Sequence, residues 1–208
     1  LVSISAVLSI LLFWNGIQNN TYGNYKIFEW ISSGNFIANW SINIDPLSSI
    51  MLVVVTFISA LVHIYSIGYM SHDPNKPRFM SYLSLFTFSM LVLVVSDNFL
   101  QLFFGWEGVG LCSYLLIGFW YKKESANNAA IKAFIVNRVG DFGLAIGIFF
   151  IFFYFGTINF REVFDLAPQY LEKNIVFFGF ESSLITLICL FLFIGAMGKS
   201  AQFLLHTW

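Results

Sequence analysis

Long apolar runs separated by short polar stretches are the dominant pattern of this 208-residue chain. An α-helix rises about 1.5 Å per residue, so about 20 apolar residues are enough to cross the hydrocarbon core of a bilayer. The pattern therefore predicts an all-α membrane protein with about six transmembrane helices. The predicted spans are residues 1–14, 46–69, 79–95, 98–120, 128–155 and 181–205, within a single transmembrane domain, 1–208.

The first span and the polar stretch behind it need separate interpretation. Residues 1–14 lack a basic segment at their start, so we read them as part of a mature, shortened span rather than as a signal peptide. Residues 15–45 form an outer loop, in which two β-prone runs, 25–31 and 36–44, flank a Ser-Ser-Gly-Asn turn at 32–35. This arrangement predicts a small β-hairpin outside the hydrocarbon.

Helix-capping residues mark two further elements. Asp45 is predicted to cap the second span, with Pro46 in its first turn. Residues 156–180 form a surface connection, in which Asn159 is predicted to cap a short amphipathic helix at 159–167. The apolar face that we expect this helix to turn toward the bilayer consists of Val163, Phe164 and Leu166.

Composition places the chain among membrane proteins and sets its orientation. Hydrophobic residues make up 58%, charged residues 10%, and the mean hydropathy is +0.78. Soluble domains carry about 25% charged residues. The net charge of −1 gives no support for a nucleic-acid partner, and membrane lipids are the expected surroundings. Loops 70–78 and 121–127 share one face and hold four of the ten basic residues, whereas acids match or outnumber bases in the loops of the opposite face. The positive-inside rule therefore predicts that these two loops face the cytoplasm or the mitochondrial matrix. The four basic residues are Lys76, Arg78, Lys122 and Lys123.

Motifs for soluble cofactors and metals are missing from the sequence. Cys112 and Cys189 lie within apolar runs, which favours small buried thiols over a disulfide or a metal pair. The sequence contains no CxxC, no HExxH and no Gly-rich phosphate loop after a strand. We therefore predict that this chain itself binds no cofactor and no metal.

Glu107 is the only acidic residue in its span, 98–120. It lies about 14 Å along the helix from the Asn98 end. An ionisable residue at such a depth usually faces the interior of a helix bundle and marks an ion or proton path. The alternative is a protonated glutamate that makes one interhelical hydrogen bond.

Three further ionisable residues lie well inside predicted spans. Arg138 and Asp141 are three residues apart, so they share a helix face and can form an ion pair, which could be purely structural. Lys199 is the predicted partner of Glu107, because desolvation penalises a charged lysine and a carboxylate within about 4–6 Å restores that charge. Such a pair can load and release a proton. The alternative for Lys199 is a side chain that reaches to the inner interface. Whether His63 or His206 takes part is open.

Several segments together resemble a known family. They are Leu102 to Trp120 (LFFGWEGVGLCSYLLIGFW), Asn137-Arg138-Val139-Gly140-Asp141, and Gly198-Lys199-Ser200-Ala201-Gln202 with His206-Thr207-Trp208. The sequence resembles the largest antiporter-like membrane subunit of respiratory complex I, NADH dehydrogenase subunit 5, most closely the mitochondrial type. The resemblance covers nearly the whole chain and about the first third of a family member, without its first helix.

The resemblance implies both a function and a set of site residues. It implies a membrane-arm subunit of a proton-pumping NADH:quinone oxidoreductase, in which Glu107 and Lys199 form the charged pair of a half-channel. Arg138 and Asp141 belong to the same polar region, and the lysine helix is interrupted near mid-membrane. NADH, flavin, iron–sulfur clusters and quinone are expected in other subunits. The implied location is the mitochondrial inner membrane, or the plasma membrane in bacteria.

Three interpretations stay open on the sequence alone. The first is the complex I subunit, whose remainder comes from further residues or from a second chain. The second is a subunit of a related Mrp-type sodium/proton antiporter. The third is a structural fragment with no proton path of its own.

Overall fold

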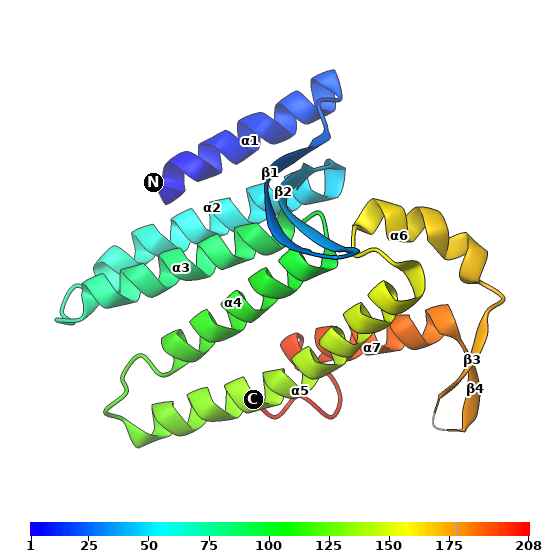
Figure 1. Ribbon diagram of the computed structural model, residues 1–208. Coiled ribbons are helices and arrows are strands. Elements are labelled where there is room, and N and C mark those ends of the chain that lie inside the picture. Colours follow the sequence, from blue (N-terminus) through cyan, green and yellow to red (C-terminus); the bar gives the residue numbers. More distant parts are fainter. Residues whose placement is uncertain (178) are drawn as a thin grey trace.

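The computed structural model describes residues 1–177 and 179–208. Its first half runs through α1, the hairpin β1–β2, α2, α3 and α4, and its second half through α5, α6, a 3₁₀ turn η1, the hairpin β3–β4 and α7 (Figure 1). The bounds are α1 Val2–Asn19, β1 Gly23–Ser33, β2 Phe36–Ile44, α2 Pro46–Tyr69, α3 Lys76–Val94, α4 Phe99–Ile117, α5 Glu124–Phe155, α6 Phe160–Leu166, η1 Ala167–Tyr170, β3 Asn174–Phe177, β4 Phe180–Ser183 and α7 Leu184–Lys199.

Helices neighbouring in sequence pack side by side, and α7 closes the bundle against α5. Hairpin β1–β2 and helix α6 lie at one end of the bundle, and the α2–α3 and α4–α5 turns lie at the other (Figure 1). Helices α1 to α5 are long and apolar enough to cross a membrane. Helix α7 has 16 residues, or about 24 Å. The structure thus confirms a mostly helical membrane bundle with a small hairpin in the predicted outer loop, and within the described residues five helices have full spanning length.

The hairpin β1–β2 confirms the predicted turn and is anchored to the bundle. Gly34 has φ of +57°, which only glycine adopts without strain, and it closes an antiparallel ladder from Gly23 opposite Ile44. The fully buried side chain of Gln101 on α4 accepts from the Ser41 backbone N–H (3.0 Å) and donates to the Ser41 carbonyl (2.8 Å). One amide side chain therefore holds the hairpin on the end of α4.

Glycines let α5 and α7 approach at backbone distance. A Cβ atom built on Gly140 would meet the Gly198 Cα at 3.0 Å and the Ile194 carbonyl oxygen at 3.1 Å. A Cβ on Gly143 would lie 2.5 Å from Ile194, and one on Gly195 would lie 2.7 Å from Leu144. Small residues commonly allow such close crossings between membrane helices. This contact places the end of α7 directly beside the middle of α5.

The structure confirms helix α6 but corrects the predicted surroundings of two side chains, Val163 and Cys189. The helix α6 and its Asn159 cap are confirmed, since the Asn159 side chain accepts from the backbone N–H groups of Arg161 and Glu162. Val163, however, does not face the bilayer. It is 6% exposed and packs into the core with Phe99 and Leu184, because α6 folds back over the ends of α4 and α5. Cys112 is buried as expected, whereas Cys189 is exposed.

The last predicted span is shorter than the apolar run, 181–205, that suggested it. Residues 181–183 belong to β4, the second strand of a hairpin that the sequence pattern did not reveal. Helix α7 then ends at Lys199, and Ala201 and Leu204 have positive φ of 49° and 77°. A left-handed backbone cannot continue an α-helix. Helix α7 therefore ends at the lysine.

Candidate functional site

Four ionisable side chains from three helices meet inside the bundle. Glu107 comes from α4, Arg138 and Asp141 from α5, and Lys199 from the last turn of α7. Their side chains are between 5% and 40% exposed, with Asp141 the most enclosed and Arg138 the least. We call these four residues the charged tetrad.

The tetrad forms a line in which acids and bases alternate. The Arg138 guanidinium donates a hydrogen bond to the Glu107 carboxylate and lies 3.8 Å from a carboxylate oxygen of Asp141. The other Asp141 oxygen lies 3.9 Å from the Lys199 ammonium. Among the described residues, Lys199 therefore has Asp141 as its ion-pair partner, not Glu107. The predicted direct Glu107–Lys199 pair is replaced by a connection through Arg138 and Asp141.

Trp106 and Gly110 complete the site, although neither was predicted from the sequence to have a role in it. The Trp106 indole N–H donates to Asp141 at 2.7 Å, and its ring lies 5.8 Å from the Lys199 ammonium. A Cβ atom at Gly110 would come within 2.6 Å of the Lys199 Nζ, so the glycine leaves room for the ammonium against α4. An indole N–H inside a membrane span needs a hydrogen-bond acceptor. This requirement could have identified Trp106 from the sequence as a residue with a polar partner.

Lys199 is held near anions without a direct hydrogen bond. Its Nζ is fully buried and has no hydrogen-bond partner in the described part of the chain. A distance of 3.9 Å to Asp141 suits an ion pair but exceeds the normal range of a hydrogen bond. The residue also ends α7, where the partial negative charge of the helix C-terminus favours a cation. An ammonium placed in this way is electrostatically compensated, while its N–H groups are not engaged by a hydrogen bond within the described residues.

A lateral cavity of about 360 Å³ opens beside the other end of the tetrad. Glu107 and Arg138 line it, so this end of the charge line is more accessible than the Asp141 end. The remaining lining is mostly apolar and comes from α3 and α4: Leu85, Phe88, Ser89, Phe104, Gly108, Leu111 and Cys112.

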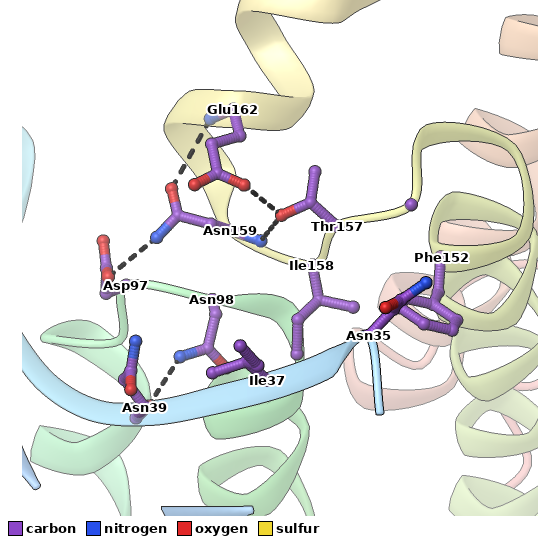
Figure 2. A pocket seen from close by; sticks show the side chains of 11 residues that line it. Asn35, Ile37, Asn39, Asp97, Asn98, Phe152, Thr157, Ile158, Asn159 and Glu162 are labelled. Carbon is purple, nitrogen blue, oxygen red and sulfur yellow. Dashed lines mark hydrogen bonds between the residues drawn. The ribbon is translucent and has the colours of Figure 1, made fainter. Parts of the chain in front are cut away.

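A second, polar cavity of about 300 Å³ lies at the hairpin end of the bundle (Figure 2). The Asn98 side chain caps α4 and donates to the Asn39 carbonyl at 2.8 Å. The Asn159 amide donates to the Asp97 carboxylate, also at 2.8 Å. These bonds connect the hairpin, the α3–α4 turn and the α5–α6 turn, so the cavity is surrounded by a hydrogen-bonded frame.

Replacing Asn98 with alanine should loosen this frame. The variant loses the cap on α4 and the bond to the hairpin, and Asn98 is only 3% exposed. We expect a loss of about 1–2 kcal/mol in unfolding free energy, measured by thermal unfolding of the purified protein. Asn24→Ala is the control, because Asn24 is an exposed hairpin residue. Equal unfolding temperatures for the two variants would show that the frame contributes nothing to stability.

Two protein-family models match the sequence of this chain. Residues 96–208 match the family described as NADH:quinone oxidoreductase/Mrp antiporter, TM, and residues 30–80 match NADH-Ubiquinone oxidoreductase (complex I), chain 5 N-terminus. NADH-quinone oxidoreductase subunit L of Rickettsia bellii (strain RML369-C) is 56% identical over 207 residues, and NADH-ubiquinone oxidoreductase chain 5 of Chondrus crispus is 54% identical over 207. Each alignment covers 100% of this chain.

The chain spans about a third of these relatives, 32% of the Rickettsia protein and 31% of the Chondrus protein. Among solved structures, the Mrp complex from Dietzia sp. DQ12-45-1b contains a chain that aligns with a TM-score of 0.80 at 21% identity. That alignment covers 100% of this chain and 21% of the other. At such low identity the likeness concerns the fold alone.

Proposed function

Because this chain belongs to the NADH:quinone oxidoreductase/Mrp antiporter family, we propose that it contributes a proton-translocating half-channel to the membrane arm of an NADH:quinone oxidoreductase. The observation that carries this proposal is the charged tetrad, which extends without a break across α4, α5 and α7. Ionisable residues inside a membrane are costly and typically belong to proton relays.

Each member of the tetrad has a distinct task in this proposal. Lys199 holds the transferable proton, since its ammonium is ion-paired but not hydrogen-bonded. Asp141 stabilises the charged lysine and is itself oriented by the Trp106 indole. Arg138 does not release a proton, so it serves as a fixed cation that couples the two carboxylates. Glu107 ends the line at the lateral cavity, where a change in its surroundings can alter the whole series of contacts.

The redox chemistry in this proposal takes place outside the chain. NADH oxidation, the flavin, the iron–sulfur clusters and quinone reduction belong to other subunits, and this chain contributes proton transfer only. Its partners are the neighbouring membrane-arm subunits, membrane lipids and whatever chain or segment supplies the rest of the subunit. The protein would lie in the mitochondrial inner membrane or, in a bacterium, in the plasma membrane.

A sodium/proton antiporter subunit is the second candidate, favoured by the fold shared with the Dietzia Mrp complex. Sequence identity favours the first candidate, because relatives at 54% and 56% identity are NADH-quinone or NADH-ubiquinone oxidoreductase subunits. The two candidate functions differ in whether proton transport depends on sodium. Proton uptake by the reconstituted complex should depend on NADH and be unchanged when potassium replaces sodium.

Glu107→Gln tests the proposed function in the assembled complex. The variant keeps the size of the side chain but leaves Arg138 without the carboxylate that it contacts. We expect proton uptake by this path, relative to NADH oxidised, to fall about 100-fold, the lower end of the range for the loss of a positioned acid–base group. Glu107→Asp should retain part of the uptake, because the charge stays and only its reach shortens.

The matched control is Glu124→Gln, which removes an exposed carboxylate in the first turn of α5. Complexes are reconstituted into vesicles, and proton uptake is measured together with NADH oxidation by an artificial acceptor. Uptake in Glu107→Gln equal to that in the control would assign the tetrad a structural role and refute the half-channel.

A further inference from the structure

A third cavity, of about 190 Å³, lies at the end of the bundle opposite the hairpin. It is formed where α3 begins, α4 ends and α5 begins, on the side that carries most of the basic loop residues. A water molecule occupies about 30 Å³, so the cavity has room for a compact polar group. It is lined by Arg78, Tyr82, Tyr114, Leu115, Gly118, Phe119, Tyr121, Asn127 and Ala130.

Arg78 is the charged member of this cavity. Its guanidinium donates one hydrogen bond to the Phe119 carbonyl at 2.9 Å. The same group lies over the rings of Phe119 and Tyr121, 4.7 and 5.1 Å from their centres. Its Nε is buried without a hydrogen-bond partner in the described residues, which also provide no ion pair to this guanidinium. The cavity is thus lined by a cation, Arg78, that has unused hydrogen-bond donors.

The acidic residue of the adjacent loop is engaged elsewhere. The Asp73 carboxylate accepts hydrogen bonds from the Trp120 indole at 2.9 Å and from the Asn75 backbone N–H at 2.8 Å. The Trp120 hydrogen bond, followed by that of Asn75, holds the pKa of Asp73 below its ordinary value. Asp73 therefore stays ionised and also interacts electrostatically with Arg78. Its oxygens accept hydrogen bonds from Trp120 and Asn75, and no ion pair with the guanidinium forms among the described residues.

The surroundings of the cavity resemble a membrane interface rather than open solvent. Lys123 lies over the Trp120 ring at 5.1 Å, and the Lys76 ammonium donates to the Ile67 carbonyl. Tyrosine and tryptophan concentrate where a bilayer meets water, and basic residues gather on its inner side. Basic pockets between transmembrane helices on this side can hold anionic lipid headgroups.

We propose that this cavity binds the headgroup phosphate of an anionic phospholipid, with Arg78 as its principal ligand. The planar guanidinium can offer two parallel donors to phosphate oxygens. Tyr82 lines the same cavity, and its hydroxyl can provide a further donor. The acyl chains extend along the apolar lipid-facing sides of α3 and α4, which a soluble phosphate would leave unused.

The test uses the assembled complex in nanodiscs of phosphatidylcholine that contain a trace of photoactivatable phosphatidylglycerol. Cross-linked peptides are mapped by mass spectrometry. In the unmodified complex, we expect labelling of peptides 76–82 and 114–121, with unlabelled phosphatidylglycerol competing and phosphatidylcholine not competing. Arg78→Gln should lower this labelling about tenfold, as expected for the loss of a hydrogen-bonded charge. Tyr82→Phe should lower it by less, and Lys122→Gln should leave it unchanged.

Several results would overturn the assignment. Equal labelling by a photoactivatable phosphatidylcholine would remove the role of headgroup charge. Competition by millimolar inorganic phosphate would identify a soluble anion as the occupant. Cross-links to a neighbouring polypeptide in place of lipid would identify a protein contact. If Arg78→Gln fails to assemble, the competition experiments on the unmodified complex still show whether an anionic lipid occupies the cavity. None of these results depends on proton translocation.

Discussion

Lys199→Ala should abolish proton translocation through this chain while leaving NADH oxidation by an artificial acceptor intact. The substitution removes the proton that Lys199 is proposed to transfer and leaves Asp141, whose side chain is 5% exposed, without its ammonium partner. Loss of a positioned proton-transfer group typically costs about 10²–10⁴-fold in rate. Proton uptake per NADH oxidised, measured in vesicles that contain the reconstituted complex, should therefore fall more than in any other variant of the tetrad.

Lys199→Arg tests whether this position needs a residue that can release a proton or only a positive charge. Arginine keeps the cation beside Asp141 but stays protonated under all conditions found in proteins. We expect assembly close to normal and translocation nearly as low as in Lys199→Ala. Lys132→Ala, which removes an exposed lysine of α5, is the control for the loss of one basic residue. Normal uptake in Lys199→Arg would mean that the lysine only balances charge.

Gly140→Ala should destabilise the protein by about 1–3 kcal/mol, the usual range for overpacking a tight interface. The added methyl group would meet the backbone of α7 at Gly198 and at the Ile194 carbonyl. Backbone atoms cannot rotate away as a flexible side chain can, so the two helices must separate. Because Lys199 follows Gly198 directly, the same shift should lengthen its distance to Asp141 and reduce translocation.

The matched control is Gly68→Ala in α2, where a Cβ atom would meet nothing within 4 Å. Alanine is intrinsically the better helix former, so this variant should be neutral or slightly stabilised. Thermal unfolding of the purified complex and proton uptake in vesicles are measured for both variants. If the two alanine variants unfold at the same temperature, the α5–α7 contact is looser than its geometry implies.

The sequence identified the charged residues because their chemistry conflicts with their surroundings. Glu107 and Lys199 stand out in apolar runs, and Arg138 and Asp141 share a face through their i, i+3 spacing. The partner of Lys199 could not be predicted in this way. It depends on how α4, α5 and α7 are rotated about their axes. The glycines of α5 at 140, 143 and 147 mark the face that meets α7, but nothing in the sequence says which helix covers that face.

Local signals were reliable where the backbone itself required a certain residue. Gly34 in the turn, Asp45 before α2 and Asn159 before α6 each occupy their predicted positions. Hairpin β3–β4 was missed because its strands are four residues each and are continuous with an apolar run. Val163 was placed on the wrong side because a seven-residue helix is too short to show which of its faces is covered.

The alternation of acids and bases in the charged tetrad has an electrical consequence. Its two carboxylates and two cations sum to zero charge, so a proton moving from Lys199 to Asp141 changes the dipole of the site but not its monopole. No isolated ion then forms in the low-dielectric interior, where it would cost several kcal/mol. A proton arriving from outside creates that ion until another leaves. In the proposed half-channel, this charge balance would tie the entry of one proton to the departure of another.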